Sequence, residues 1–566
     1  MYNNFSEFIP KNKHTEKLIQ DIKKAADDYI GTQIPSLKYS DYCDVFKTYD
    51  RLNYEEKYIE HRRRLNVFLI MVLYDGSTQY INELQNILWA ICDEFSWCLP
   101  AHMHIVKGDK TVKDIVKAVD IFAAETVFYL SEAVYLTKNK IDSMVYNRVK
   151  YEITRRVITP YLTQNLNWAK NNWSGVCASS IGTALIYLDM KKEFGIAKNN
   201  ILNSINDFLL SYDKDGCCKE GALYWVYGFG FFCYFAQLLR EFTNGKINLF
   251  KNEKVKKTAE FGNNVYTQKN NTIPFSDAPH ELKFNAGLFT FLSKEYGFSV
   301  PPLQYESCFG DDVRYRMCHM IRDFYWYDED ISYGGKKPNF KYYENSMWYI
   351  NRKENFVFAA KGGNNCEPHN HNDLGSFILY DDGKYIIDDL GWPVYGKGYF
   401  DIDTRYSKYI CASSRGHSVP QIDGGEQLCG ENGFAELIDC NDSCFILDLS
   451  NAYDTNCKII RKFSVYDNII KITDTLPDNS TERFVTRIKP QVLNKNGLRY
   501  VRIANWDIRC EDDCFVNIYE ETFKPRNTIV KSSMKDEETA YLIDFTPKEY
   551  KDSITISIYR RNCNEQ

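Results

Sequence analysis

Two histidines spaced two residues apart open the stretch of the sequence that is richest in groups able to do chemistry. His369 and His371 precede an apolar run at residues 375–380, and a hairpin-type turn at residues 381–384 leads to a second run that ends in Asp388. Residues i and i+2 of an extended chain share one side, so the two imidazoles are expected to project together. The hairpin would bring Asp388 back towards them, and two histidines with one aspartate suit a divalent metal.

A third histidine, His417, lies in a Gly- and Ser-containing loop at residues 413–424 and adds another nitrogen ligand. Three histidines and an aspartate would allow a metal site with one histidine left for catalysis. The alternative is that the spacing has no functional meaning, since a second pair, His102 and His104, shows the same spacing. Metal ligation also requires a geometry that spacing alone does not define.

Length and composition narrow the class of protein. With 566 residues the chain exceeds the limit of about 250–300 residues for a single hydrophobic core, so at least two domains are expected. The aromatic content of 15% suits either packed cores or a sugar-binding cleft. The formal net charge of −6 gives no sign of nucleic-acid binding, although a local basic cleft would still admit an anionic substrate.

The cysteines and the apolar segments indicate in which cellular compartment the protein is expected and whether it would cross a membrane. The 18 cysteines form no Cys-x-x-Cys pair and residues 1–17 contain no apolar signal core, so we expect a cytoplasmic protein with reduced, mostly buried thiols. Residues 222–239 are apolar over a length that would cross a membrane. Their glycines, tyrosines and charged flanks favour a buried helix in a large helical domain instead, and no membrane partner is expected.

Helical periodicity dominates residues 1–300. Apolar residues recur at spacings of three and four, as in Ile115, Val119, Phe122 and Ala123. The predicted helices cover residues 16–29 (with Thr15 as the N-cap), 65–74, 79–94, 112–136, 141–163, 179–193, 197–211 and 222–242. Many helices joined by short connections indicate a helical toroid or solenoid, although no fixed-period repeat is present.

The pattern changes from about residue 346 to short apolar strands separated by turns. The predicted strands cover residues 347–360, 376–380, 385–387, 435–439, 444–449, 458–464, 469–474, 483–489 and 553–559. Such a series predicts an antiparallel β-sandwich. The predicted domains are therefore a helical domain at 1–300, a linker at 301–345 that contains Pro and Gly clusters, and a β-sandwich domain at 346–566.

Two stretches of the helical part add candidate chemistry. Asn171 and Asn172 stand at a junction between helical segments, where a turn with an Asn cap is the alternative explanation. Residues 215–225 lead into the long apolar helix and include Tyr224, with Tyr227 one turn later. For a tyrosine taken at random, packing in a core is the more common role.

These residues resemble the heparinase II/III superfamily of polysaccharide lyases. The resemblance is carried by residues 171–177, 215–230 and 369–391, with residues 415–424 and 97–102 in support. It implies a helical toroid followed by an antiparallel β-sandwich, with the active site in the cleft between them. It also implies an anionic, uronate-containing polysaccharide or oligosaccharide as substrate, cleaved by β-elimination to leave a 4,5-unsaturated uronate end.

The resemblance also implies roles for individual residues. Asn172 matches the residue that binds the uronate carboxylate, Tyr224 the catalytic tyrosine and His369 the catalytic histidine. Asn171 and Tyr227 are the rival or neighbouring positions, retained as substrate-binding candidates.

The remaining implied positions concern the metal and the substrate. His371, Asp388 and His417 match the ligands of a structural metal, usually zinc, with manganese as the alternative. His102 resembles a substrate-contacting histidine.

β-Elimination explains why such residues would be needed. A base removes the C5 proton beside the uronate carboxylate, and hydrogen-bond donors must meet the charge that develops there. A tyrosine has a pKa of about 10, so nearby positive charge must help it act as base; Arg405 and Arg415 are candidate sources besides His369. A neutral tyrosine can protonate the departing oxygen.

Two other functions fit the same sequence. One is a uronate-glycan-binding protein that has this architecture without the chemistry. The other is a glycoside hydrolase on a helical toroid, which would need two carboxylic acids across a cleft; Glu220, Asp215 and Asp373 are the candidates.

Overall fold

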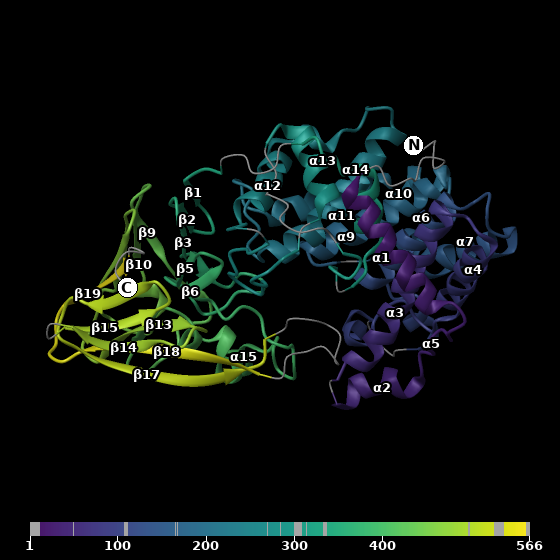
Figure 1. The fold of residues 1–566 in the computed structure, drawn as a ribbon. Coiled ribbons are helices and arrows are strands. Elements are labelled where there is room, and N and C mark those ends of the chain that lie inside the picture. Colours follow the sequence, from purple (N-terminus) through teal and green to yellow (C-terminus); the bar gives the residue numbers. More distant parts are fainter. Residues whose placement is uncertain are drawn as a thin grey trace.

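The computed structural model has a helical half followed by a β-sheet half, which lie side by side (Figure 1). It describes residues 12–48, 50–106, 111–164, 166, 168–268, 270–283, 285–298, 308–312, 314–331, 337–495, 498–525 and 537–561. The predicted order of a helical domain and then antiparallel sheets is confirmed.

The helices occupy the chain up to residue 326, with one short helix later. They are α1 (Lys13–Tyr29), α2 (Tyr39–Thr48), α3 (Leu52–Tyr74), α4 (Thr78–Asp93), α5 (Val112–Val116), α6 (Ile121–Leu136), α7 (Ser143–Ile153), α8 (Thr159–Thr163), α9 (Asn172–Tyr187), α10 (Lys191–Ser211), α11 (Ala222–Phe242), α12 (Glu253–Asn264), α13 (Ala286–Tyr296), α14 (Met317–Trp326) and α15 (Ile402–Lys408). The short 3-10 helix η2 (Pro100–Ile105) lies between α4 and α5.

The strands follow from residue 340. They are β1 (Phe340–Tyr343), β2 (Trp348–Arg352), β3 (Phe356–Lys361), β4 (Asn364–Asn365), β5 (Phe377–Asp381), β6 (Lys384–Ile387), β7 (Pro420–Ile422), β8 (Gly430–Phe434), β9 (Glu436–Cys440), β10 (Cys444–Asp448), β11 (Ile460–Val465), β12 (Ile469–Thr475), β13 (Ser480–Thr486), β14 (Gln491–Lys495), β15 (Leu498–Ile503), β16 (Trp506–Cys510), β17 (Cys514–Phe523), β18 (Glu538–Pro547) and β19 (Ser553–Arg560).

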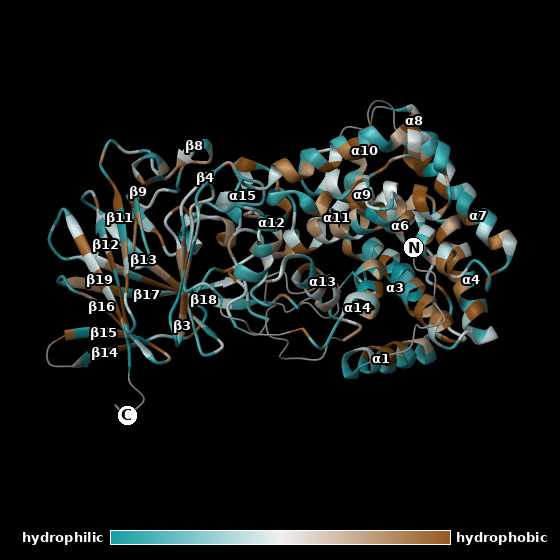
Figure 2. Ribbon diagram, turned by 90° about the horizontal axis from the view of Figure 1, so that it is seen from above, coloured by the Kyte–Doolittle hydropathy of each residue, from teal (hydrophilic) through white to brown (hydrophobic). Residues whose placement is uncertain are grey.

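The helical half has an inner and an outer layer of helices. The inner helices α6, α9 and α11 are buried on almost every side, and α9 packs on α6, α10 and α11. The outer helix α1 buries only one stripe, which includes Leu18, Ile22 and Ala26, as expected for an amphipathic helix. Figure 2 shows α1 as mostly hydrophilic at the edge of this half. This two-layer arrangement is the predicted helical toroid.

Helix α11 is the one helix among the described residues that is long and apolar enough to cross a membrane. Its most apolar window is 78% buried against the rest of the protein, which is the arrangement of a core helix. The sequence-based expectation of a buried helix therefore agrees with its position at the centre of the helical half (Figure 1).

Several helix ends differ from the sequence predictions, and two of the differences are explained by capping side chains. The N-cap of α1 is Asn12, whose side chain accepts a hydrogen bond from the backbone N–H of Thr15, so Thr15 is the third residue of the helix and not its cap. The predicted helix at 112–136 is two helices, because Asp120 caps α6 by accepting a hydrogen bond from the N–H of Ala123. Capping side chains of this kind fix where a helix begins.

The described strands form four antiparallel sheets. Their orders are β1-β2-β3-β5-β6, β14-β15-β16-β19-β12-β11-β10-β9, β17-β18-β13-β7 and β4-β8. The predicted strand at 347–360 is the hairpin of β2 and β3, with Trp348 opposite Lys361. The predicted turn at 381–384 joins β5 to β6, with Asp382 and Gly383 at positive φ as a tight hairpin requires.

The first sheet is buried on both faces, and this sets the two halves against each other. Ile350, Ala359 and Ile378 belong to the hydrophobic core shared with the helices, whereas their neighbours Tyr349 and Phe358 belong to the core of the β-sandwich. Alternation of side chains across a strand explains how one sheet serves two cores. The chemistry-bearing loops after β3 and β6 are thereby held against the helical half.

The segment predicted as a linker at 301–345 contains α14 and β1, while residues 301–307, 313 and 332–336 lie outside the described part of the chain. The boundary between the domains thus remains a prediction. Cys510 and Cys514 are joined by a disulfide bond, which differs from the expectation of reduced thiols for this pair.

Candidate active site

A large cavity lies between the two halves and has a volume of about 1420 Å³. The helical half contributes Tyr224, His102 and Trp173 to its walls, and the β half contributes His369 and Tyr395. A cavity of this size at a domain junction, lined by aromatic and ionisable groups, suits a ligand of several sugar rings.

Tyr224 and His369 meet in this cavity from opposite halves of the protein. The hydroxyl of Tyr224 is 3.3 Å from Nδ1 of His369 and 3.2 Å from the hydroxyl of Tyr395. The Tyr224 and His369 rings are stacked with centroids 4.4 Å apart. The pairing of these two residues is an arrangement that acid–base catalysis would require.

The start of α11 places Tyr224 close to the β half. Gly221, the N-cap of α11, has φ of +92°, and a Cβ there would be 3.0 Å from both the Cβ of Ala278 and the carbonyl oxygen of Phe275. The loop that contains Phe275 and Ala278 is also tied to this point by the Ser276 hydroxyl, which donates to the carbonyl oxygen of Lys219 at 2.9 Å. A glycine is needed here for both the backbone angle and the close approach.

The same loop carries Asp277, a fully buried carboxylate that the sequence analysis missed. Nδ1 of His369 lies 2.8 Å from its Oδ2 and Nε2 of His371 lies 3.1 Å from its Oδ1. The two histidines thus converge as predicted, although their segment is a loop with His369 at φ +58° and not a strand. Burial lowers the pKa of His369, but Asp277 and then Glu220 raise it more, so its pKa lies above the usual value.

Glu220 and Asn172 form a second pair of polar groups beside His369. Both are buried, and Oε2 of Glu220 is 3.8 Å from Nε2 of His369. Burial raises the pKa of Glu220, with only partial compensation from His369 and from a hydrogen bond with Asn172. Asn171, Asn172 and Glu220 line a smaller neighbouring cavity of about 300 Å³, so the asparagines do not share the wall of the large cavity.

A glycine of α11 makes room for Asn172. A Cβ on Gly228 would be 1.7 Å from Oδ1 of Asn172 and 3.0 Å from the ring of Phe208. We expect Gly228→Ala to displace Asn172 and to lower the free energy of unfolding by about 1–3 kcal/mol, because the helix cannot accommodate the extra carbon. Chemical unfolding measures the loss. Gly195→Ala in α10 is the control, since nothing lies within 4 Å of its Cβ position; equal stability of the two variants would contradict the account.

The other predicted substrate-binding residues divide into two groups. His102 and Tyr227 line the large cavity with Tyr224. Nδ1 of His102 bonds to Asp120 at 2.7 Å, and its ring centroid is 5.0 Å from that of Trp173. The Tyr227 hydroxyl donates to Glu125, and burial together with that carboxylate raises the pKa of Tyr227 well above the ordinary value, so it is the poorer acid–base group.

The two arginines lie away from both cavities. Arg405 is buried in α15, where it donates to the Tyr399 hydroxyl at 3.0 Å and lies 3.8 Å from Asp277. Arg415 has a half-exposed side chain whose nearest carboxylate is Glu426 at 3.7 Å. Arg405 faces the site through Asp277 and Tyr399, and its charge lowers the pKa of His369, whereas the structure does not bring Arg415 to the site.

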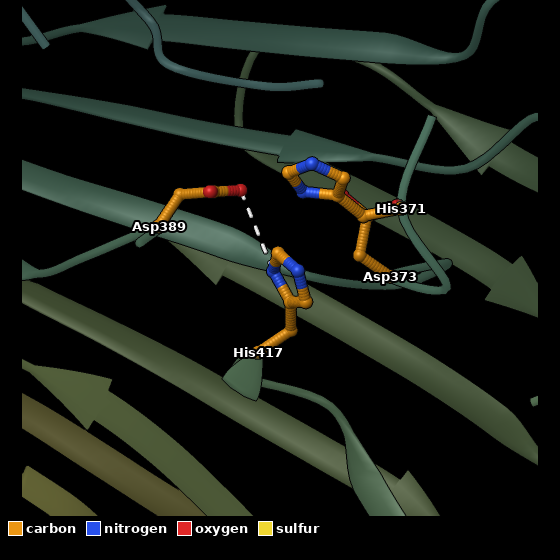
Figure 3. Close-up of side chains that lie close together, drawn as sticks. All are labelled: His371, Asp373, Asp389 and His417. Carbon is orange, nitrogen blue, oxygen red and sulfur yellow. Dashed lines mark ion pairs between the residues drawn. The ribbon is translucent and has the colours of Figure 1, made fainter. Parts of the chain in front are cut away.

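A group of four buried side chains near His369 has the composition of a metal site. His371, Asp373, Asp389 and His417 each offer an atom, and these atoms all lie within 4.8 Å of one another (Figure 3). All four residues are fully buried. Nδ1 of His417 is 3.4 Å from Oδ2 of Asp389, and Oδ1 of Asp373 also pairs with Lys361 at 2.8 Å.

The predicted ligand Asp388 is not part of this group and is replaced in it by its neighbour Asp389. Oδ1 of Asp388 is 2.7 Å from Nε2 of His280, and its Oδ2 accepts a hydrogen bond from Arg487 at 2.7 Å. Strand β6 ends at Ile387, and the two aspartates that follow it serve different partners. The adjacent pair of acids in the sequence could have signalled this alternative, whereas nothing in the sequence pointed to Asp277 or Tyr395.

Known proteins with a similar sequence or structure identify this architecture. The family model described as Heparinase II/III-like, C-terminal matches residues 335–557. A mutant of the heparan sulfate lyase HepC from Pedobacter heparinus superposes with a TM-score of 0.62 at 14% identity, over 90% of this chain and 78% of that one. A search of curated proteins found no match.

Two further solved structures show the same fold. A structure of heparinase III has a TM-score of 0.61 at 14% identity, over 99% of this chain and 94% of that one. Chondroitin AC lyase from Streptomyces coelicolor A3, solved in complex with chondroitin sulphate, has a TM-score of 0.56 at 9% identity, over 98% of this chain and 81% of that one.

The fold is therefore that of the polysaccharide lyases in which a helical toroid precedes a β-sandwich. Within residues 335–557 the sequence matches the model of the heparinase II/III-like C-terminal domain. The resemblance seen in the sequence is confirmed at the level of this domain and of the whole fold.

Proposed function

We propose that the protein is a lyase that cleaves uronate-containing polysaccharides or oligosaccharides, of the glycosaminoglycan type, by β-elimination. The observation that supports this most strongly is the contact of 3.3 Å between Tyr224 of the helical half and His369 of the β half in a large cavity. Elimination needs an acid–base pair beside a bound sugar ring, and these two residues come together only in the folded protein.

In this proposal the phenol of Tyr224 exchanges protons with the substrate. It removes the C5 proton or protonates the departing C4 oxygen, and it does both where proton and leaving group lie on the same side of the ring. His369 beside it stabilises the phenolate, because the raised pKa of His369 favours the charged imidazole. For the opposite epimer at C5, the neutral form of His369, with Nε2 free to accept a proton, is the better base.

Glu220 and Asn172, which line the smaller cavity, are proposed to receive the uronate carboxylate where that cavity adjoins His369, whose Nε2 is 3.8 Å from Oε2 of Glu220. Negative charge grows on that carboxylate as the C5 proton leaves, so donors must face it. The Asn172 amide is a hydrogen-bond donor to that carboxylate, and burial, which raises the pKa of Glu220, makes the protonated, donating form of Glu220 easier to reach when a second carboxylate binds beside it.

The alternative of a glycoside hydrolase has less support. Of its three candidate acids only Glu220 lies beside His369; Asp215 accepts backbone hydrogen bonds from Cys217 and Glu344, and Asp373 pairs with Lys361. Two acids placed across one sugar ring are therefore not offered by this set. A binding protein without chemistry would leave the Tyr224–His369 contact without a use.

Ultraviolet absorbance tests the proposal, because β-elimination creates a C4–C5 double bond conjugated to the carboxylate. We expect purified protein to raise the absorbance of at least one of heparan sulfate, chondroitin, hyaluronan or alginate fragments. Cleavage without an absorbance increase would support the hydrolase, and binding without cleavage would support the glycan-binding protein; either result rejects the lyase.

We also propose that His371, His417 and Asp389 hold a divalent metal, with zinc favoured over manganese by the two imidazoles. The fit rests on buried polar atoms: within the described part of the chain, Nδ1 of His371, Nδ1 of His417 and Oδ2 of Asp389 have no hydrogen-bond partner, and the last two face each other as an ion pair at 3.4 Å. Oδ2 of Asp373 is a fourth such atom. Buried polar atoms of this kind require a partner, and a bound cation supplies one. The metal would fix the loops that carry these residues.

Single substitutions of the adjacent residues Asp388 and Asp389 distinguish the proposed metal ligand from its neighbour. Asp389→Asn is expected to lower metal affinity by at least the factor of about 10–100 that is typical for the loss of an outer-shell partner, and to lower the melting temperature, because it removes a ligand itself. Asp388→Asn is the matched control and should keep its metal while weakening the Arg487 and His280 contacts. Elemental analysis of the purified variants measures both. Metal loss in Asp388→Asn with retention in Asp389→Asn would reverse the assignment.

A further inference from the structure

Asp277 lies outside the large cavity but is hydrogen-bonded to His369, the proposed catalytic histidine. The inference about its role rests on the proposed function. We infer that Asp277 is a positioning residue that holds His369 and His371 in fixed orientations and fixes which nitrogen of each ring carries a proton. Asp277 is fully buried and belongs to the helical half, whereas both histidines belong to the β half.

Among the described residues, four groups donate hydrogen bonds to the Asp277 carboxylate. Oδ2 accepts hydrogen bonds from Nδ1–H of His369 and from the hydroxyl of Tyr395, each at 2.8 Å. Oδ1 accepts hydrogen bonds from Nε2–H of His371 at 3.1 Å and from the hydroxyl of Tyr399. An ionised carboxylate has about four acceptor positions, so the group is saturated by these partners.

The backbone reinforces the arrangement. The N–H of Asp277 donates to the carbonyl oxygen of His369 at 3.1 Å, so the two residues are joined by both a main-chain and a side-chain bond. Ser276 and His369 both have positive φ, of +66° and +58°. Positive φ in residues other than glycine is costly and persists where surrounding contacts hold it. The contacts made by Asp277 are therefore well placed to fix the position of His369.

The proton positions follow from the acceptor. Since a carboxylate accepts only, Nδ1 of His369 carries a proton and faces the Tyr224 oxygen, 3.3 Å away, as a donor. The Tyr395 hydroxyl gives its proton to Asp277, so its oxygen can accept from Tyr224 at 3.2 Å. Asp277 thereby fixes the hydrogen-bonding roles of both groups that contact the Tyr224 hydroxyl, His369 as donor and Tyr395 as acceptor, without lining the substrate cavity itself.

The same reasoning applies to His371. Its Nε2–H donates to Asp277, which leaves Nδ1 unprotonated and directed to the group of His417 and Asp389. A carboxylate that orients a histidine in this way raises its basicity as a ligand. One side chain therefore orients both the candidate catalytic histidine and the candidate metal ligand.

Asp277→Asn tests the inference, since asparagine keeps the size but has one acceptor oxygen and presents an NH₂ group to two of the four donors. We expect kcat on the uronate glycan that wild type cleaves to fall about 10–100-fold, with KM close to wild type. The matched control is Asp381→Asn, a buried carboxylate that accepts bonds from Asn505 and Trp506 within the β half. It should lose stability but keep the kcat of wild type.

A second variant guards against misfolding of Asp277→Asn. Tyr399→Phe removes one donor from Oδ1 with no change of ring size, and kcat should fall several-fold with KM unchanged. Wild-type kcat in a folded Asp277→Asn variant, or in Tyr399→Phe if Asp277→Asn does not fold, would overturn the inference. An equal loss of kcat in Asp381→Asn would also overturn it, because the effect would then be structural.

Crystal structures separate this inference from the proposed function. Wild type without lyase activity on any glycan would reject the function, yet the His369 ring in Asp277→Asn could still be compared with wild type. In Asp277→Asn we expect the His369 ring to take a different orientation from wild type or to be divided between two orientations. An unchanged ring that still bonds to residue 277 would reject it.

Discussion

Tyr224→Phe should lower kcat by about 10²–10⁴-fold while leaving the fold intact, because it removes the only group proposed to exchange protons with both C5 and the C4 oxygen. The Tyr224 hydroxyl contacts His369 and Tyr395 in the cavity, while the partly buried ring packs against the edge of the helical core. The aromatic ring, which stacks on His369, is retained. Steady-state kinetics and thermal unfolding of both proteins measure the two effects.

Tyr227→Phe is the matched control for this prediction. Tyr227 lies one turn along the same helix and lines the same cavity, but its hydroxyl is bonded to Glu125. We expect its turnover to remain within a few-fold of wild type and its stability to fall, because Glu125 loses a buried donor. A loss in Tyr227→Phe that exceeds the loss in Tyr224→Phe would exchange the two roles.

His369→Ala is expected to reduce kcat by a similar factor of about 10²–10⁴. The imidazole is the cationic group next to Tyr224, and its pKa is raised by Asp277 and Glu220 despite burial. Its removal leaves the phenolate unsupported and leaves Asp277 with an unused acceptor. Kinetics at saturating substrate isolate this effect from binding.

His102→Ala provides the comparison for His369→Ala. His102 lines the cavity beside Trp173, and no contact joins it to Tyr224 among those described. Its loss should therefore raise KM more than it lowers kcat. A pure KM effect in His369→Ala would place His369 among the substrate-binding residues and contradict its proposed role.

The parts of the fold that could be predicted from the sequence are those with strong local signals. Helix α11 is apolar over most of its length, and the turn between β5 and β6 contains Asp-Gly at the two positions that need positive φ. By contrast, β17 has mainly exposed or partly exposed residues between its buried ends, so its alternation was too weak to predict a strand.

The candidate site shows the same limit. Tyr224, His369, His371 and His417 stand in recognisable segments, and the structure brings all four to one region. Asp277 lies 92 residues from His369 in a loop without periodicity, so only the packing of the two halves reveals their contact. The choice between Asp388 and Asp389 also needed the structure, because the alternation of a strand no longer assigns sides once β6 has ended.

The most direct test is to measure the masses of the products formed from a defined uronate oligosaccharide in water labelled with heavy oxygen. Elimination adds no water, so the account predicts two products whose masses sum to that of the substrate, with no label incorporated, and almost no product from Tyr224→Phe. Products that together gain one labelled water would show hydrolysis and contradict the central claim.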